Sequence, residues 1–270
     1  MCPTGPTFLS IIPASSPLLD AVTFREDGFQ KFSGVFSGDE IVRAQEAIDL
    51  VLADIAEGTR RPDNITFLSN LREIQNLGVS ITDKTDAPFI VGELAGWSAV
   101  LKDIILHERL WSLAEELLGS RNIVYHFSNL TRKAAVVGPN IGWHRDYPNH
   151  YICPAESKSF LRFLIPLEPM DAENGCTQAI PGTHELGDAE ARRLKEAKEK
   201  NYDLTDAIDL EAGSGDVLAI HSLAVHGGGE NRSGRHRNVI VAQYGVATEE
   251  WFAWNPEMFS GQSREKIFAA

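Results

Sequence analysis

The spacing of apolar residues divides the chain into a helical first part and a strand-rich second part. Apolar side chains recur at helical intervals after Ser37-Gly38-Asp39-Glu40, which reads as a capping box, and they continue to Gly58. A second helix is predicted over residues 101–118, with Gly119 as its C-cap. We expect the first helix to pack against a β-structure that the rest of the chain forms.

Runs rich in β-branched and aromatic residues dominate from residue 123 onward. Strands are predicted at 123–137, 160–167, 176–180, 217–222 and 237–246. Helices first and many short strands later favour a mainly β fold with flanking α-helices, namely a double-stranded β-helix of the jelly-roll, cupin-like type. The strongly charged segment 189–200 interrupts the strands and is predicted to be a solvated helix.

The length of 270 residues suits a single catalytic domain, 1–270. We expect a helical part over about residues 1–120, a β-helix core over about 121–247 and a C-terminal tail over 248–270. The irregular segments 59–92 and 147–159 are predicted to be loops over the mouth of the site, where loops on a rigid scaffold often carry substrate contacts.

The charge balance points to a small-molecule partner. Lys and Arg number 25 against 38 Asp and Glu, a net charge of −13, and no basic stretch is interleaved with aromatics, which argues against nucleic acid. No apolar run approaches a membrane span, and the N-terminus lacks the basic region of a secretory signal. The three unpatterned cysteines suit a reducing cytoplasm. The amino-acid sequence indicates no particular oligomeric state.

Two histidines and an aspartate provide the candidate chemistry. His144-Arg145-Asp146 is followed 82 residues after His144 by His226 and 11 residues later by Arg237. Two imidazoles and a carboxylate form the facial triad that holds Fe(II) and leaves positions open for a chelating cosubstrate and O₂. Residues i and i+2 of a strand point the same way, so His144 and Asp146 can share an ion. His226 lies in the apolar strand predicted over 216–229, whose final glycines permit close approach to a metal.

Further segments match one known family in order and spacing, over roughly residues 20–246. They are Arg25-Glu26-Asp27-Gly28-Phe29, Trp143-His144-Arg145-Asp146, Asn174-Gly175-Cys176, Pro181-Gly182-Thr183-His184, Gly215-Asp216-Val217-Leu218, His221, His226-Gly227, Asn231-Arg232-Ser233 and Arg237. In these segments the chain resembles the phytanoyl-CoA dioxygenase family of Fe(II)/2-oxoglutarate oxygenases. The resemblance implies that His144, Asp146 and His226 are the catalytic iron ligands, and that Arg237 pairs with the distal carboxylate of 2-oxoglutarate.

The resemblance also implies the type of reaction. Halogenating relatives have glycine or alanine at the position of Asp146, so the carboxylate favours hydroxylation or another oxidation, with succinate and CO₂ as coproducts. A guanidinium suits the pairing of Arg237 with the distal carboxylate, since its two parallel N–H groups form charge-assisted hydrogen bonds with a carboxylate and the cation is costly to bury unpaired. The alternative for Arg237 is a structural salt bridge.

One departure from the family pattern affects the cosubstrate. A serine often found two residues after the third metal ligand is Gly228 here, so its hydrogen bond must come from elsewhere or be missing. Asn129, Thr131 and Lys133 occupy the place where relatives contact the other carboxylate, and strand alternation puts them on one face. Thr131 is the first candidate and Lys133 the second. The alternative is that all three are surface residues on a solvent-facing strand.

Substrate contacts are predicted from basic and polar residues near the metal motif. Arg162 lies between Phe160 and Leu164 on an apolar strand face and is the first candidate, although it could instead serve the cosubstrate. With His150, Lys133 and His184 it suggests a small anionic or zwitterionic substrate such as an amino acid, a small acid or a phosphonate-like compound; Tyr147 is a further candidate. Each has a surface or salt-bridge alternative.

Other assignments remain open at this point. His221 could be the third ligand, but the glycine run and the spacing to Arg237 follow His226. The same ligand set also serves catalytic zinc; a hydrolase would have no need of Arg237 as a dicarboxylate anchor, and intact ligands argue against a non-catalytic binder. The substrate could also be a larger natural-product scaffold that undergoes cyclisation, desaturation or epoxidation, and fold does not choose among these.

Overall fold

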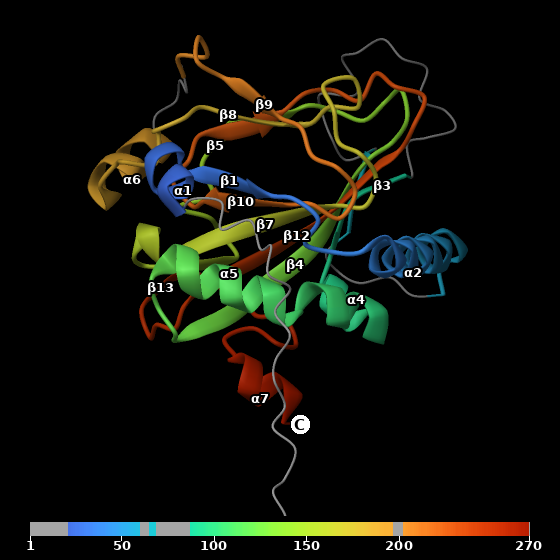
Figure 1. The fold of residues 1–270 in the computed structure, drawn as a ribbon, viewed down its shortest axis with the longest axis horizontal. Coiled ribbons are helices and arrows are strands. Elements are labelled where there is room, and N and C mark those ends of the chain that lie inside the picture. Colours follow the sequence, from blue (N-terminus) through green and yellow to red (C-terminus); the bar gives the residue numbers. More distant parts are fainter. Residues whose placement is uncertain (1–20, 60–64, 69–86, 197–201, 270) are drawn as a thin grey trace, which may run out of the picture.

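Two antiparallel sheets face each other in the computed structural model (Figure 1), which describes residues 21–59, 65–68, 87–196 and 202–269. Within these residues the larger sheet has the order β1-β10-β7-β12-β4-β3-β2, and the smaller sheet the order β5-β11-β8-β9. The strands of the larger sheet are β1 (Phe29–Phe32), β2 (Ile65–Phe67), β3 (Pro88–Gly92), β4 (Ile123–Lys133), β7 (Phe160–Pro166), β10 (Val217–His221) and β12 (Arg237–Val246). Those of the smaller sheet are β5 (Ile141–His144), β8 (Thr177–Ala179), β9 (Ile208–Leu210) and β11 (His226–Gly228). The predicted mainly β, cupin-like fold with flanking helices is confirmed.

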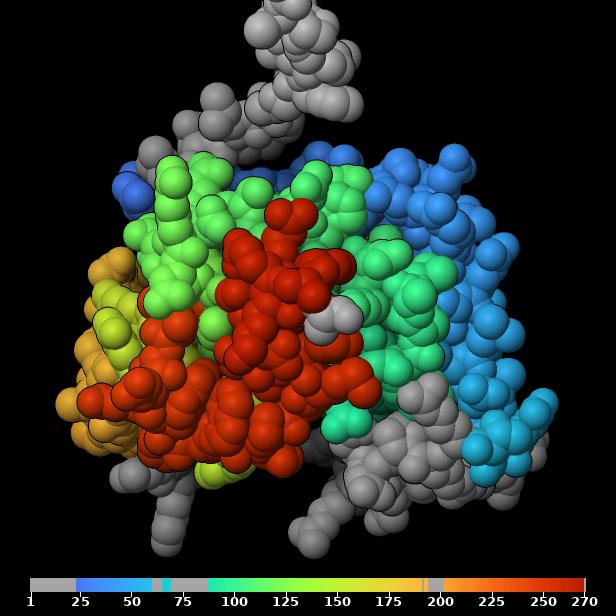
Figure 2. All heavy atoms as spheres, turned by 90° about the horizontal axis from the view of Figure 1, so that it is seen from below, coloured from blue at the N-terminus to red at the C-terminus, as the bar shows by residue number. Residues whose placement is uncertain are grey.

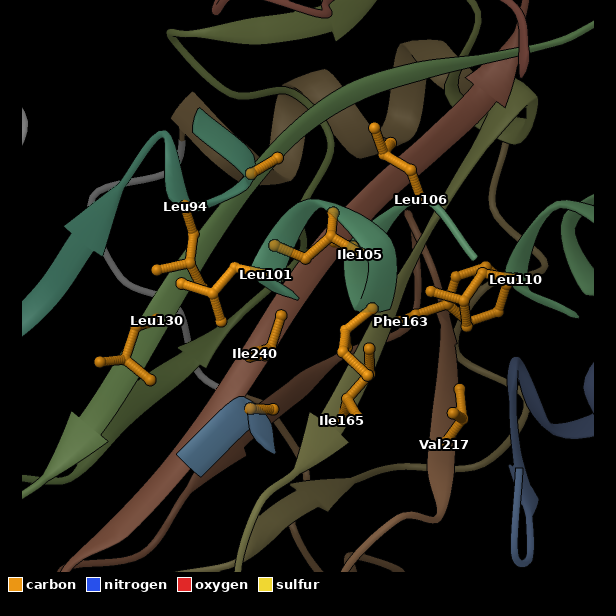
Figure 3. Close-up of a cluster of buried hydrophobic side chains, with 14 of the residues drawn as sticks. Leu94, Leu101, Ile105, Leu106, Leu110, Leu130, Phe163, Ile165, Val217 and Ile240 are labelled. Carbon is orange, nitrogen blue, oxygen red and sulfur yellow. The ribbon is translucent and has the colours of Figure 1, made fainter. Parts of the chain in front are cut away.

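Helices cover one face of the larger sheet. Those that contribute to the apolar core there are α1 (Ala21–Asp27), α2 (Gly38–Glu57), α4 (Ala99–Ile105), α5 (Glu108–Leu118) and α7 (Arg264–Phe268). The helix α6 (Asp188–Glu196) instead contacts the segment after β5, where Arg192 donates to Tyr147 and Ala155. Short 3-10 turns are η2 (Leu94–Gly96) and η3 (Ser157–Ser159). Figure 3 shows Leu101 and Ile105 of α4 and Leu110 of α5 packed with Phe163 and Ile240 of the sheet. This cluster is the main apolar core.

Strand alternation gives the larger sheet two different faces. On β12, Ile240 and Tyr244 face the helices, whereas Val239 and Val241 face the smaller sheet. Because successive side chains of a strand point to opposite faces, one strand can support the core and line a site at the same time. The space between the two sheets is therefore bordered by every second residue of β4, β7 and β12.

The first predicted helix is confirmed, and the second is two helices. Ser37 caps α2 with the predicted capping box, and Gly58 ends the helix in the left-handed conformation at φ 70°. The prediction of one helix over 101–118 was wrong, because the chain leaves helical geometry at Leu106 and His107. His107 is extended, and its Nδ1 accepts a hydrogen bond from the backbone of Arg109, so it starts α5 as an N-cap.

The strand predicted at 217–222 is confirmed as β10, but the wider apolar segment 216–229 is not one strand. It forms β10 and β11, which belong to different sheets, with a turn at 222–225 between them. The turn is held by other segments, since Ser222 accepts a hydrogen bond from the backbone of Tyr147 and Leu223 accepts one from the Arg145 side chain. His221 and His226 therefore face different surroundings despite a five-residue spacing.

The segments predicted as mouth loops contain short strands. In 59–92, β2 and β3 extend the edge of the larger sheet, whereas 60–64 and 69–86 lie outside the described residues. In 147–159, β6 (Ile152–Pro154) pairs with β13 (Trp251–Trp254) of the C-terminal part. The charged segment 189–200 is helical in α6 as far as Glu196, and its last residues are outside the described range.

The C-terminal residues pack on the body of the protein. Figure 2 shows them in red, lying between the green and teal residues of the helical layer. A salt bridge joins Arg264 to Glu108 over 3.1 Å, and Lys102 of α4 lies over the rings of Phe259 and Phe268. Among the described residues, no helix is both long and apolar enough to cross a membrane. The single domain and the cytoplasmic location stay predictions.

Candidate metal centre and cosubstrate site

Strand pairing brings the two predicted histidine ligands together. His144 ends β5 and His226 begins β11, and the two residues are direct partners in the antiparallel ladder. Their rings lie 4.2 Å apart, centroid to centroid. Asp146 follows two residues after the end of β5, and the hydrogen bond from the Tyr147 backbone to Ser222 holds this turn against the segment between β10 and β11.

The three side chains converge on one point. Asp146 Oδ1 lies 3.7 Å from Nε2 of His144 and 3.9 Å from Nε2 of His226. Two atoms that each bind a divalent first-row ion at about 2.1 Å can be at most ~4.2 Å apart, so these separations fit a shared ion. Among the His, Cys, Asp and Glu residues of the described part of the chain, these three form the group that could hold a metal ion.

Backbone carbonyls orient both imidazoles for metal binding. Nδ1 of His144 lies 2.8 Å from the carbonyl of Gly142, and Nδ1 of His226 lies 3.0 Å from that of Ala224. An Nδ1–H that donates to a carbonyl leaves the Nε2 lone pair available for a metal. Burial, with the neighbouring His226, lowers the pKa of His144 to about 3, so that ring is neutral at pH 7. These residues therefore fit Fe(II).

Arg162 pairs with the metal ligand Asp146. Its Nη1 forms a salt bridge with Oδ1 of Asp146, its Nη2 donates to the hydroxyl of Tyr151 over 2.6 Å, and its Nε donates to Gln243 over 3.1 Å. The guanidinium also lies over the ring of Phe127, 5.2 Å from the centroid. Arg162 was predicted to contact substrate; it lines the cavity beside the triad and also positions the carboxylate of Asp146.

A cavity of about 230 Å³ opens between the two sheets at the metal triad. The larger sheet, including β3, borders it on one side, and the smaller sheet borders it on the other. The lining residues are Phe89, Ile90, Asn129, Thr131, Ile141, His144, Tyr151, Arg162, Leu164, Thr177, His226, Gly227, Arg237, Val239 and Val241. The cavity joins both histidines to Arg237, as the sequence predicts.

Arg237 is buried at the far side of this cavity. Its Nη1 donates to the carbonyl of Gly175 over 2.6 Å and lies 3.7 Å from the sulfur of Met170. Its Nε has no hydrogen-bond partner within the described residues, and no carboxylate there makes a salt bridge with it. Burial lowers the pKa of Arg237 to about 10, which still leaves it charged at pH 7. A buried cation with an unused donor is suited to an anionic ligand.

The three candidates on β4 divide into two groups. Asn129 and Thr131 line the cavity, and the Thr131 hydroxyl donates to Asn129 over 3.1 Å. Lys133 is not among the lining residues; it is fully buried, and its Nζ donates to the carbonyls of Gly175 and Gly229. Lys133 thus lies on the Arg237 side of the site. The roles of all three in cosubstrate binding stay predictions.

Three of the predicted substrate residues lie elsewhere. His184 is buried with its Nε2 2.9 Å from the carbonyl of Arg25, and a Cβ on Gly28 would come within 2.6 Å of its ring. Tyr147 is buried and donates to the carbonyl of Ala155, while His150 is exposed. None of the three lines the cavity. The matching Gly28 and His184 segments therefore join the N-terminal part to the β-helix.

The structure adds lining residues that the sequence interpretation missed. Tyr151 belongs to the loop 147–159 that was predicted to carry substrate contacts, and its hydroxyl accepts a hydrogen bond from Arg162, a contact that the sequence did not indicate. Phe89 and Ile90 belong to β3, inside a segment interpreted as a loop. The apolar run Phe89-Ile90-Val91 was the available signal for a strand there.

The fold and the site together define the class of protein. A cupin-like pair of sheets with two histidines, one carboxylate and a buried arginine at one cavity is a non-haem iron oxygenase that depends on 2-oxoglutarate. Within that class, the chain belongs to the phytanoyl-CoA dioxygenase family, whose model matches residues 24–239.

Individual relatives agree with this assignment. The chain is 25% identical over 230 residues to dioxygenase FrzG of Cladobotryum sp, covering 82% of this chain and 72% of that protein. It is 22% identical over 259 residues to L-proline trans-4-hydroxylase of Streptomyces griseoviridis, covering 87% and 88%. The crystal structure of EctD from S. alaskensis with bound Fe matches with a TM-score of 0.67 and 20% identity, covering 92% of this chain and 81% of that one. The predicted enzyme class and its iron and 2-oxoglutarate dependence are thus confirmed.

Proposed function

We propose that this protein hydroxylates a small-molecule metabolite and converts 2-oxoglutarate and O₂ into succinate and CO₂. The observation that carries the proposal is that the triad of His144, Asp146 and His226 and the guanidinium of Arg237 border one cavity. Iron bound by the triad would supply the activation of O₂. The chain supplies the ligands, an anchor for a dicarboxylate, and a largely apolar wall.

The residues of the cavity divide into a cosubstrate end and a substrate end. Arg237, Thr131 and Val239 border the cosubstrate end, where charge and apolar surface match the two ends of a short dicarboxylate. Tyr151, which contacts Arg162, borders the other end. The ion pair between Arg162 and Asp146 holds the carboxylate in place from the substrate side.

A second cavity supports a zwitterionic substrate. It has a volume of about 300 Å³ and shares Ile90, Asn129 and Tyr151 with the first. Glu93 and Glu257 line it, whereas Arg162 lines the first cavity. Three contacts use three of the five donors of the Arg162 guanidinium. We therefore propose an amino-acid-like substrate whose acidic group lies toward Arg162 and whose amino group lies toward Glu257.

A larger natural-product scaffold is the second candidate. The observation in its favour is the same second cavity, which extends the space beyond what a small acid fills. The two candidates differ in which compounds increase succinate release. Free amino acids would do so for the first candidate, and polycyclic compounds without an amino acid group for the second.

An anaerobic titration tests the proposed class of reaction. Apo-protein is given Fe(II) and then 2-oxoglutarate while the weak visible charge-transfer band of a chelated keto acid is followed, with His226→Ala as the negative control. The proposal expects a band in the wild type and none in the variant, followed by O₂-dependent succinate release. Stoichiometric iron without a band would overturn it in favour of a zinc or non-catalytic metal site.

A further inference from the structure

Two buried basic side chains stand opposite each other at one end of the larger sheet. Lys133, the last residue of β4, and Arg237, the first of β12, are direct partners in the antiparallel ladder. Their exposed fractions are 0% and 3%, and both donate to the carbonyl of Gly175. Like charges directly opposite in a sheet destabilise it, and buried charges need a counter-charge. In the described part of the chain, no salt bridge to a carboxylate supplies one for either residue.

The ammonium of Lys133 occupies space that a side chain at position 228 would need. A Cβ built on Gly228 would lie 3.1 Å from Nζ of Lys133 and 3.2 Å from the carbonyl oxygen of Cys176. Gly228 is the position, two residues after His226, where the family resemblance leads us to expect a serine. Glycine at 228 and lysine at 133 are therefore spatially coupled: the missing side chain leaves room for the ammonium.

We propose that Lys133 takes the place of the family serine and, together with Arg237, binds the distal carboxylate of 2-oxoglutarate. This inference rests on the proposed function and adds a second anchoring residue to it. A carboxylate has two oxygens and about four acceptor positions, so it can accept from a guanidinium and an ammonium at once. The donors of lysine rotate freely, which lets Nζ exchange a carbonyl partner for a carboxylate without a backbone change.

The surroundings of Lys133 indicate that binding of an anion is accompanied by uptake of a proton. Burial, and then the charge of Arg237, lower the pKa of Lys133 to about 6. Cys176 and Glu230 raise it, but less strongly. Without a ligand the amine is therefore mostly neutral at pH 7.5. A carboxylate beside it favours the ammonium, so binding of 2-oxoglutarate should take up a proton.

The first experiment compares two keto acids on three proteins. The dissociation constants of 2-oxoglutarate and of 2-oxopentanoate, which lacks the distal carboxylate, are measured anaerobically with Fe(II)-loaded wild type, Lys133→Met and Lys133→Met/Gly228→Ser. We expect Lys133→Met to weaken 2-oxoglutarate roughly 10- to 100-fold, as for loss of a hydrogen bond to a charged group, and to leave 2-oxopentanoate unchanged. The added serine should restore part of the loss. The exposed Lys31→Met is the matched control.

The second experiment needs no variant. Calorimetric titration of wild-type enzyme with 2-oxoglutarate at pH 7.5, in buffers of different ionisation enthalpy, should show uptake of close to one proton. Unchanged affinity in Lys133→Met, equal loss for both keto acids, or no proton uptake by the wild type would each overturn the role of Lys133. Failure of the wild type to bind 2-oxoglutarate at all would instead overturn the proposed function.

Discussion

Replacement of Arg237 by Met tests how the cosubstrate is held. The guanidinium is 3% exposed, donates to the carbonyl of Gly175 over 2.6 Å and is still charged at neutral pH, because burial lowers its pKa only to about 10. Loss of one partner of such a desolvated charge pair costs ~2 to 4 kcal/mol. The affinity for 2-oxoglutarate should therefore fall about 30- to 900-fold.

The assay is the anaerobic charge-transfer titration with Fe(II)-loaded protein, and Arg232→Met is the matched control. Arg232 is 80% exposed and pairs only with Glu230 at the surface, so its replacement should change the affinity less than about twofold. Because iron is bound by other residues, Arg237→Met should retain iron stoichiometry. Wild-type affinity for 2-oxoglutarate in Arg237→Met would refute the assignment of this residue as the anchor.

Three further predictions follow from single positions. With Lys133 protonated in the complex and neutral in the free protein above pH 6, 2-oxoglutarate affinity should fall by up to about tenfold per pH unit between about pH 6.5 and 8.5, and Lys133→Met should flatten this slope. Gly175→Ala places a Cβ 2.4 Å from the carbonyl oxygen of Gly229 at φ +79°, so urea unfolding should show a loss of about 1 to 3 kcal/mol together with weaker 2-oxoglutarate binding. Ser37→Ala removes the cap of α2 and should lower the free energy of unfolding by about 1 kcal/mol, with 2-oxoglutarate affinity unchanged. A flat pH profile, a fully stable Gly175→Ala or a weakened cosubstrate in Ser37→Ala would each contradict its prediction.

The triad was predictable because its signals are local. His144 and Asp146 are two residues apart, and His226 is followed directly by glycines, so both halves can be recognised without knowledge of the fold. The ladder pairing of His144 with His226 is not local, since it depends on how the whole smaller sheet assembles. The sequence predicted the ligands, and the structure explains why 82 intervening residues bring them together.

The wrong predictions concern the ends of helices and strands and the role of His184, which the spacing of apolar residues does not determine. The segment over 217–228 is buried throughout, so it has no alternation that would show where β10 ends and β11 begins. The break between α4 and α5 depends on the backbone geometry of His107 as a cap, a role that its residue type does not announce. His184 resembled a ligand-binding residue, but its ring fills the space beside Gly28, and only the fold puts those two positions together.

Lys133 illustrates the difference between face and depth. Strand alternation correctly placed it on the same side of β4 as Asn129 and Thr131, yet those two line the cavity while Lys133 lies behind it, against Gly228 and Arg237. Strand alternation shows to which face of the sheet a side chain points. Whether that side chain lines the cavity or is buried beyond it depends on the size of its neighbours, here Gly228. The absent serine and the buried lysine therefore have one explanation, which neither position suggests alone.

The arrangement of the cavity separates what defines the class from what selects the substrate. The triad, Arg237 and Lys133 belong to strands of the two facing sheets or to the turn directly after one of them. Among these strands, β4, β11 and β12 have neighbours on both sides, whereas β5 is an edge strand that pairs with β11. Tyr151, just before β6, borders the cavity next to Arg162 and belongs to no strand. A change at this position can alter the shape of the cavity without moving the metal. Substitutions of Tyr151 should therefore change which compounds stimulate succinate release while leaving iron and 2-oxoglutarate binding intact.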